Sequence, residues 1–243
     1  MKNDYPLFLP SVIATSTISN NKLTNEKTRL YETRKALISV LDKGYFKKII
    51  IVDGSNVEIL SQKEIEKYCK MGFHIEQFKF QQDTNQVKLF GKSNGEIQIT
   101  EYMLENSKLA IDSGGFYKLS PRWALCNIDL ILPKIQDIDN FFYYFHPSGI
   151  RNFRSFVCTS FYKTSIEFYK KNLSGCIGEC GLDVDGYLES VFFSRLSKLS
   201  KNGVKVEFPF FSGIGGTLGA PITNRYYFLR NYMSKAGLLA YSF

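Results

Sequence analysis

The sequence predicts an α/β fold in which helices flank a mainly parallel sheet, with a less regular C-terminal half. Three observations predict this fold class. Apolar, β-branched segments alternate with helical patterns over the first 80 residues, and such alternation is typical of crossover units. The segment KIIIVD at 48–53 is almost entirely apolar, as expected of a central parallel strand. The connections are short, and the length of 243 residues suits a single domain over 1–243.

The first half divides into strands and helices in strict alternation. The segment SVIATSTIS is rich in β-branched residues and indicates the first strand. The next segment places leucines on one helical face and is followed by Gly44, which favours a helix end there. The expected elements are a strand at 11–19, a helix at 24–42, a strand at 48–53, a helix at 62–71 and a strand at 73–80. We expect the three strands to be mutually parallel.

The second half mixes strands and helices less regularly. Ser93 and Glu96 have the spacing of a helix capping box. The expected elements are a helix at 93–109, an extended stretch at 116–129, strands at 141–146 and 155–160, a helix at 164–172, a glycine-rich loop at 175–186, an amphipathic helix at 187–199, a strand at 204–211, a loop at 212–219 and a helix at 224–239.

Polar residues follow each of the three strands expected in the first half. These segments are 16–20, 53–56 and 81–85, and all three are rich in hydrogen-bonding side chains. Ligands of open parallel sheets bind beyond the carboxyl ends of the strands. We therefore expect the binding site at this edge.

Composition favours an anionic partner other than nucleic acid. The formal net charge is +8, so the surface attracts anions such as phosphorylated substrates or anionic lipid. The lysines and arginines are scattered, and the densest clusters are the pairs Lys47-Lys48 and Lys170-Lys171. Without a basic arm or an Arg-rich helix, a nucleic-acid-binding protein is disfavoured.

The cysteines predict a reduced compartment without a disulfide or a structural metal. There are five, an odd number, and no two have CxxC spacing. The N-terminus lacks the pattern of a signal peptide, and no apolar run is long enough to span a bilayer. We expect a cytoplasmic protein, with peripheral contact to the inner membrane as an option.

Cationic side chains are the first candidates for an anion site. Arg29 lies in the first turn of the first long helix, near the expected ligand edge. Lys118 and Arg122 are separated by an even number of positions, so in an extended segment both point to one face and suit a diphosphate. A solvated surface is the alternative interpretation of this pair.

Four residues are candidates for a general base: Glu96, Asp129, His146 and Glu189. Structural interpretations stand beside them. Glu96 has the spacing to cap Ser93, Glu189 suits the first turn of its helix, and His146 lies in a loop before Pro147.

Two acidic pairs and one loop are weaker signals. Asp137 and Asp139, and Asp183 and Asp185, have the Asp-x-Asp spacing of a metal site, but neither pair follows the third parallel strand, and Asp185 suits a helix N-cap. We therefore favour a metal-independent protein with no cofactor, leaving a divalent metal open. The loop at 212–219 is neither a Walker A motif nor GxGxxG opening a helix, so it is a weak phosphate cradle and a plausible mobile lid.

Several short motifs together resemble a group of bacterial glycosyltransferases from capsule and lipopolysaccharide clusters. They are Thr17-Ile18, Arg29-Leu30, Asp53-Gly54-Ser55-Asn56, Gly95-Glu96, Lys118-Leu119 with Arg122 and Asn127, Tyr187-Leu188-Glu189, and the glycine-rich segment Gly213–Gly219. The resemblance covers most of the chain. It departs from the group at Pro121, where the usual residue is Gly.

The resemblance implies a Rossmann-like, GT-A-like fold, an activated sugar donor and a glycan or lipid-linked acceptor. It implies a donor-binding half at 1–110 and an acceptor and catalytic half at 111–243. The implied donor- and phosphate-binding residues are Thr17, Arg29, Asp53, Lys118, Arg122, Gly215 and Gly216. The implied catalytic residues come from the four base candidates.

Two other functions remain open at this stage. A phosphoribosyl-type transferase would use a phospho-sugar diphosphate and suit the basic charge, although the acidic pair and loop of standard phosphoribosyltransferases are not evident. A non-catalytic module that binds glycan or an anionic polymer would need no donor pocket.

Overall fold

The structure is a computed structural model that describes residues 4–15, 23–146, 155–183, 186–215, 219–222 and 226–243. Within that part of the chain, one nine-stranded sheet has the order β3-β2-β1-β4-β8-β6-β11-β9, with β7 paired to β6. Its strands are β1 (Leu7–Ser11), β2 (Lys48–Asp53), β3 (His74–Lys79), β4 (Gly115–Leu119), β6 (Phe141–Phe145), β7 (Phe156–Val157), β8 (Phe161–Ser165), β9 (Asn202–Gly203) and β11 (Ala240–Ser242). A separate antiparallel pair joins β5 (Trp123–Leu125) and β10 (Phe211–Gly213).

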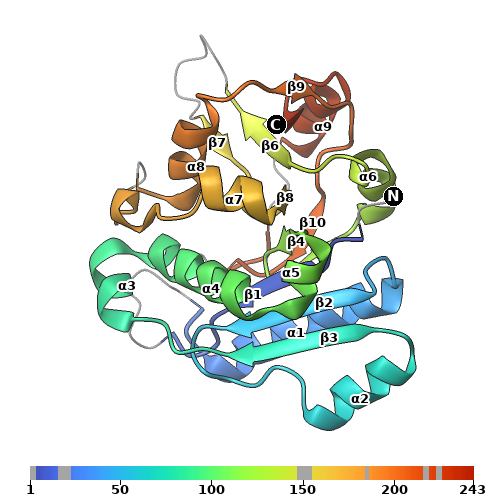
Figure 1. The fold of residues 1–243 in the computed structure, drawn as a ribbon, viewed down its shortest axis with the longest axis vertical. Helices are drawn as coiled ribbons and strands as arrows, with labels where there is room; N and C mark the ends of the chain where they lie inside the picture. The colour runs from blue at the N-terminus through green and yellow to red at the C-terminus, as the bar shows by residue number, and fades with distance from the viewer. Residues whose placement is uncertain (1–3, 16–22, 147–154, 184–185, 216–218, 223–225) are drawn as a thin grey trace.

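Helices flank both faces of this sheet (Figure 1). They are α1 (Glu26–Lys43), α2 (Gln62–Lys70), α3 (Thr84–Phe90), α4 (Lys92–Asn106), α5 (Lys108–Ser113), α6 (Ile128–Ile135), α7 (Ile166–Asn172), α8 (Leu188–Leu196) and α9 (Tyr227–Lys235), with a short 3-10 turn at Ile177–Glu179. No helix of the described residues is long and apolar enough to cross a bilayer.

The sheet is parallel at one end and antiparallel at the other. β1, β2, β3 and β4 run parallel to one another, which confirms the expected parallel arrangement of the first three strands. β8 then pairs antiparallel with β4 and with β6, and β11 pairs antiparallel with β6. The fold is therefore a mixed α/β fold compatible with a Rossmann-like core, and the expectation of a mainly parallel sheet describes its first half.

The first strand lies earlier than predicted, at Leu7–Ser11 instead of 11–19. This strand contains Pro10, and proline lacks the N–H that a central ladder needs. Pro6 accepts a hydrogen bond from β4 and Ser11 accepts one from β2, so strand alternation turns Pro10 toward β4. The β1–β4 ladder has already ended at Phe8, so proline costs no ladder bond there.

The predicted capping box at Ser93 is wrong. α4 begins at Lys92 after Gly91, so Ser93 is already helical and buried. Its hydroxyl accepts a hydrogen bond from the Leu188 N–H at 3.0 Å, and Glu96 turns toward Lys118 instead. Ser93 therefore joins α4 to α8, which brings two distant helices to one edge of the sheet.

Other strand boundaries differ from the predicted ones where backbone N–H groups bond side chains instead of a neighbouring strand. Of the segment predicted as a strand at 204–211, only Phe211 belongs to a strand, β10. The N–H groups of Phe208 and Phe210 instead donate to the side-chain oxygens of Asn231 and Asn127. The helices α3 and α6 and the strands β8 and β11 were not predicted as such, because their segments are short.

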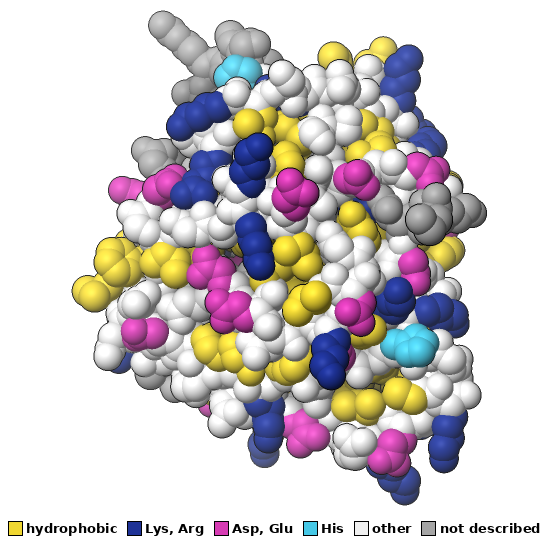
Figure 2. Space-filling model, viewed as in Figure 1, with side chains coloured by type: hydrophobic (Ala, Val, Ile, Leu, Met, Phe, Trp, Pro, Cys, Tyr) yellow, Lys and Arg dark blue, Asp and Glu magenta, His cyan; other side chains and the backbone are white. Residues whose placement is uncertain are grey.

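Alternating strand residues build one core on each face of the sheet. Leu7, Leu9 and Ile51 pack on the face covered by α1 and α6, and Phe8 and Ile50 pack on the face covered by α4, α7 and α8. Helices from opposite faces thus meet beyond the carboxyl ends of β1 and β4. On the surface shown in Figure 2, lysines and arginines are interspersed with acidic residues and form no continuous stripe.

Candidate functional site

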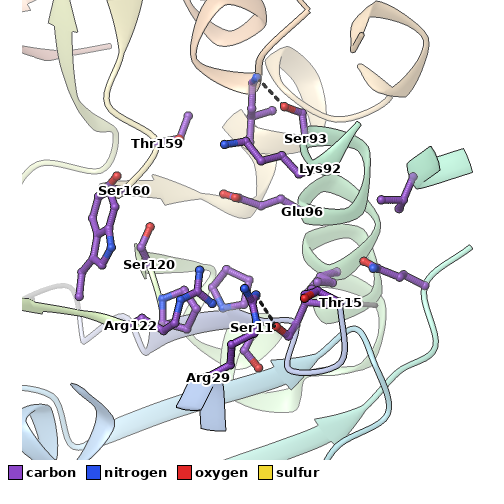
Figure 3. A pocket seen from close by; sticks show the side chains of 18 of the residues that line it. Ser11, Thr15, Arg29, Lys92, Ser93, Glu96, Ser120, Arg122, Thr159 and Ser160 are labelled. Atoms are coloured by element: carbon purple, nitrogen blue, oxygen red, sulfur yellow. Dashed lines mark hydrogen bonds between the residues drawn. The ribbon is translucent and has the colours of Figure 1, made fainter. Parts of the chain in front are cut away.

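A cavity of about 190 Å³ lies beyond the carboxyl ends of β1 and β4, at the edge where the sequence predicted a ligand. Side chains from several parts of the fold face it (Figure 3). They come from the end of β1, the first turn of α1, the segment after β3, the N-terminal half of α4, the turn after β4, the turn before β8 and the start of α8. The polar and charged residues that line it are Ser11, Thr15, Arg29, Gln82, Lys92, Ser93, Glu96, Ser120, Arg122, Thr159, Ser160 and Glu189.

Asp53 fixes the loops at this edge of the sheet by hydrogen bonds and does not line the cavity. Its side chain is fully buried at the end of β2. It accepts hydrogen bonds from the Ser11 hydroxyl at 2.6 Å, from the Ser55 hydroxyl at 2.6 Å and from the backbone N–H groups of Ile13, Ser55 and Val57. It holds the loops after β1 and β2, and it lies beside the cavity where a donor-binding residue was expected to line it.

Arg29 combines a structural role with a charge at the cavity. Its side chain is 3% exposed. Its Nε and Nη2 donate to the Val12 carbonyl at 2.9 and 2.6 Å, and its Nη1 donates to the Leu23 carbonyl at 3.0 Å. Burial and the neighbouring Arg122 cation lower the pKa of Arg29 to about 9, and Asp53 opposes this shift. Arg29 therefore remains a cation at neutral pH, and no ion pair to it forms within the described part of the chain.

Arg122 is the cation with the least compensation. Its Nε is buried without a hydrogen-bond partner, and no ion pair forms at its side chain among the described residues. Burial lowers the pKa of Arg122, while the nearby Glu96 carboxylate opposes this shift. The Thr15 hydroxyl and the Gln82 amide oxygen also line the cavity and are buried without partners. Buried polar groups are normally satisfied, so this group of atoms points to an absent ligand.

Lys118 lies below the cavity and does not face it. It is 1% exposed, and its Nζ lies 2.6 Å from Glu96 Oε1 and 2.5 Å from the Thr159 carbonyl oxygen. The expected pairing of Lys118 with Arg122 on one extended face is wrong. β4 ends at Leu119, and Ser120 to Trp123 form a turn closed by a hydrogen bond of 3.2 Å from the Trp123 N–H to the Ser120 carbonyl.

Pro121 explains that turn. It occupies the second position, where its fixed φ favours a β-turn. The residue that departs from the resembled group thus separates a buried structural lysine from an arginine at the cavity.

Two of the four base candidates line the cavity, Glu96 and Glu189. Glu96 is engaged by Lys118. Glu189 lies in the first turn of α8 and accepts a hydrogen bond from the Thr159 hydroxyl at 3.1 Å. Because its partner is a neutral hydroxyl, whereas that of Glu96 is an ammonium, Glu189 has the less neutralised carboxylate of the two.

The other two base candidates do not line the cavity. Asp129 is exposed in the first turn of α6. His146 is exposed after β6, where its Nδ1 contacts the Ser155 hydroxyl at 2.8 Å and its ring packs beside Phe193. Their prediction as catalytic residues therefore has no support from the cavity.

The expected glycine contacts also differ. Gly215 follows Ile214, which pairs with Pro221, and its own N–H donates to the Ala220 carbonyl. Gly215 does not line the cavity. Thr17 and Gly216 lie outside the described residues, as does Asp185.

The acidic pairs do not form a metal site within the described part of the chain. No group of three His, Cys, Asp or Glu suited to a metal occurs there. Asp139 lies close to Tyr5, because burial and the Asp139 carboxylate raise the pKa of Tyr5. Tyr5 precedes β1, so Asp137 and Asp139 lie near the amino ends of the strands, whereas the cavity lies beyond their carboxyl ends. Asp183 accepts a hydrogen bond from the Gly186 N–H within its own loop.

Sequence reasoning missed several residues that line the cavity. Ser120, Thr159, Ser160 and Trp123 were not singled out, whereas Gln82 belongs to the polar segment 81–85 that was expected at the ligand edge. Trp123 carried a usable signal, because it is the only tryptophan of the chain and follows the Arg122 motif directly. The other three have common side chains in loops, where neither periodicity nor spacing marks them.

Comparison with known proteins adds little to this description. No family model and no curated protein matches the chain. The crystal structure of HddC from Yersinia pseudotuberculosis aligns with 94% of this chain and 99% of its own, at 11% sequence identity and a TM-score of 0.36. At that level of likeness, no statement about this chain rests on the alignment.

Proposed function

We propose that this protein is a glycosyltransferase that moves a sugar from a nucleotide- or other phosphate-linked donor to a hydroxyl of a surface-polysaccharide or lipopolysaccharide acceptor. The observation that carries the proposal is a pair of cations, the buried Arg29 and the partly buried Arg122, which line one cavity. Neither forms an ion pair among the described residues. A diphosphate would satisfy both the charge and the hydrogen bonds. The change from parallel β1–β4 to antiparallel β8 is compatible with a GT-A-like version of the fold.

The proposed chemistry needs three elements that the cavity can supply. The acceptor hydroxyl oxygen forms a bond to the anomeric carbon of the donor, and its proton passes to the Glu189 carboxylate. The bond from that carbon to the phosphate oxygen breaks, and its electron pair stays on the phosphate. Arg122 and Arg29 meet the charge that develops there, which is the task a preorganised cationic site performs best.

Glu96 has a supporting role in this proposal. Its carboxylate is held by Lys118, which in turn holds the Thr159 carbonyl. Since the Thr159 hydroxyl bonds Glu189, the chain from Glu96 through Lys118 and Thr159 positions the proposed base. Arginine cations take the place of a metal in neutralising the leaving group, so we propose that turnover does not require a divalent ion.

The test is a thermal-shift panel with UDP, GDP, CMP and phosphoribosyl diphosphate, each with and without EDTA. A ligand at about 100 times its Kd should raise Tm by roughly 5–10 °C. Arg122→Ala should lose this shift, and Lys170→Ala, which changes an exposed cation on α7, should keep it.

Other outcomes decide against the proposal. Stabilisation by phosphoribosyl diphosphate alone would indicate a phosphoribosyl-type transferase. No shift with any of the four ligands would favour a non-catalytic binding module. A shift that EDTA abolishes would show that a metal, not the arginines, meets the phosphate charge.

A further inference from the structure

A second cavity, of about 210 Å³, adjoins the first. The two share Trp123, Thr159, Ser160 and Glu189 as lining residues. Glu189, the proposed base, therefore stands in the wall between them. A group in the second cavity can reach Glu189 from the side opposite to the arginines.

The second cavity has aromatic walls fixed by tertiary contacts. Trp123 packs against Phe211 with ring centroids 5.2 Å apart, and Phe208 packs edge-on against Tyr143 at 5.3 Å. The Phe208 N–H donates to Asn231 of α9 at 2.9 Å, which joins this wall to the terminal helix. Aromatic faces of this kind bind the apolar faces of sugar rings, and their positions do not depend on a ligand.

Arg230 is the cation that lines this cavity. Its guanidinium carbon lies 5.8 Å from the centre of the Phe156 ring and 5.6 Å from that of Phe208. No carboxylate pairs with it among the described residues. Aromatic rings that pack on a guanidinium fix the orientation of its plane. Its N–H donors lie at the edge of that plane and can bind a planar or tetrahedral anion.

We propose that the second cavity binds the acceptor, and that the acceptor is an anionic saccharide. Its ring packs on the aromatic walls, its carboxylate or phosphate pairs with Arg230, and its reactive hydroxyl points to Glu189. This inference rests on the proposed function, because it assigns the substrate that gives its proton to Glu189 while the hydroxyl oxygen bonds the donor carbon and the phosphate leaves.

The anionic group has two chemical sources. It is either a sugar carboxylate or the phosphate that links a sugar to a lipid. The outer face of α9 bears on this choice, since Phe228 is 87% exposed, Tyr232 75% and Leu229 56%. The same helix provides Tyr227 and Arg230 to the cavity, so a lipid chain leaving the cavity would meet an apolar surface.

The experiment uses the fluorescence of Trp123, the only tryptophan, which lines both cavities. Methyl glucoside, methyl glucuronide and the octyl phosphodiester of glucose are titrated into the full-length protein. Methyl glucuronide differs from methyl glucoside only in a carboxylate, so this pair isolates the charge. At least one anionic probe should bind about tenfold more tightly than methyl glucoside, the gain typical of a hydrogen bond to a charged group.

Two variants locate the effect. Arg230→Gln should abolish the preference for the anionic probe, and Lys205→Gln, which removes an exposed cation elsewhere, should keep it. Preference for the glucuronide identifies a carboxylated glycan, and preference for the phosphodiester identifies a lipid-phosphate source.

The inference is overturned if no probe binds, if the anionic probes bind no more tightly than methyl glucoside, or if Arg230→Gln retains the preference. It is also overturned if the probes compete with the nucleotide that stabilises the protein, because they would then occupy the first cavity. The proposed function is tested separately, since Arg230→Gln should keep the nucleotide-induced thermal shift that Arg122→Ala loses.

Discussion

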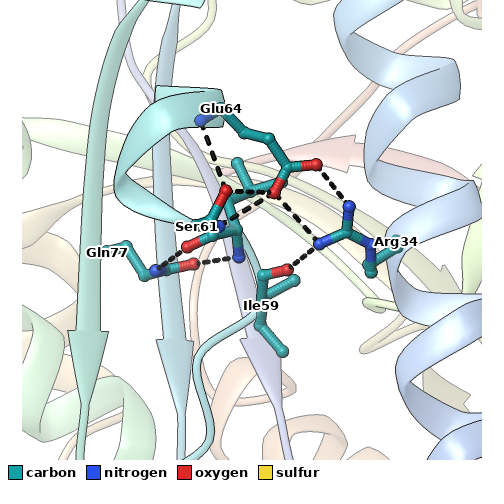
Figure 4. Close-up of polar contacts among 6 residues, drawn as sticks. Arg34, Ile59, Ser61, Glu64 and Gln77 are labelled. Atoms are coloured by element: carbon teal, nitrogen blue, oxygen red, sulfur yellow. Dashed lines mark hydrogen bonds and ion pairs between the residues drawn. The ribbon is translucent and has the colours of Figure 1, made fainter. Parts of the chain in front are cut away.

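The helix α1 carries two arginines in contrasting surroundings, Arg29 and Arg34. The Arg34 guanidinium pairs with Glu64 of α2 and donates to the Ile59 carbonyl at 2.6 Å (Figure 4). Glu64 also closes the capping box of α2 with Ser61. The hydrogen bond from Arg34 is the largest of several contacts that lower the pKa of Glu64 to about 2. Every charge in this network has its partner within the protein.

Arg29 lies near Arg122, and both line a cavity without forming an ion pair among the described residues. Placing like charges side by side away from water costs free energy of folding, which the more distant Asp53 and Glu96 carboxylates compensate only in part. A paired arginine thus stabilises the fold, whereas arginines without an ion pair leave their charge for a ligand. The predictions below test this distinction.

The largest effect is expected for Arg122→Ala on turnover. Losing a charge-assisted contact to the leaving phosphate in a desolvated site should cost about 2–4 kcal/mol, or roughly 30- to 1000-fold in rate. Arg122→Lys should recover only part of the rate, since lysine lacks the planar fork. Turnover is measured with the donor that the thermal-shift panel identifies, and circular dichroism confirms folding.

Arg34→Ala is the matched control for Arg122→Ala. It should lower Tm and leave turnover within about twofold, because Arg34 lies outside both cavities. Equal losses of turnover in the two variants would remove the distinction between paired and unpaired arginines.

Lys118→Met should destabilise the protein by about 1–2 kcal/mol. Lys118 is as buried as Arg29 but is paired, and its removal leaves the Glu96 carboxylate, which is 33% exposed, without its ammonium partner. Urea unfolding measures the effect. Adding Glu96→Gln should restore part of the stability, and if the double variant is no more stable than the single one, the pairing is not the source.

The Arg34–Glu64 pair should make stability depend on acid pH. The folded pKa of Glu64, about 2, lies below the value of about 4.3 for an unfolded glutamate. Its contribution is therefore complete above about pH 5 and is lost as the pH falls from about 4.3 toward 2. About a third of each side chain is exposed, so solvent screening limits the contribution to about 1 kcal/mol.

Glu64→Gln isolates this contribution. Urea unfolding at pH 7 and at pH 3 should show a difference between the wild type and the variant that shrinks at the lower pH. If the difference in free energy of unfolding between wild type and variant stays constant between the two pH values, capping by the neutral side chain, and not the charge of Glu64, determines this contribution to stability.

The smallest effect is expected for Lys170→Ala. Lys170 is exposed near the end of α7 and forms no ion pair within the described residues. Its loss should change stability by less than about 0.5 kcal/mol and leave turnover unchanged. A larger effect would indicate that general surface charge, and not the two arginines at the cavity, attracts the substrate.

Local signals in the sequence were sufficient for β2, α1 and α2 but not for the position of β1 or for α3. β2 lies at the predicted 48–53, and α1 and α2 begin within two residues of the predicted positions, because caps, apolar runs and glycine stops act over a few residues. The second half resisted prediction, since short strands such as β11 form only against a partner that is distant in the chain, here β6.

For the candidate site, the sequence by itself determined the residue types and the edge of the sheet. It identified Arg29, Arg122, Glu96 and Glu189, all of which line the cavity. The tertiary structure decided which charges are paired: it buried Lys118 against Glu96 and left Arg122 without a carboxylate. The physical reason is that pairing depends on distances between side chains from different elements, and spacing along one strand cannot specify these once the chain turns at Pro121.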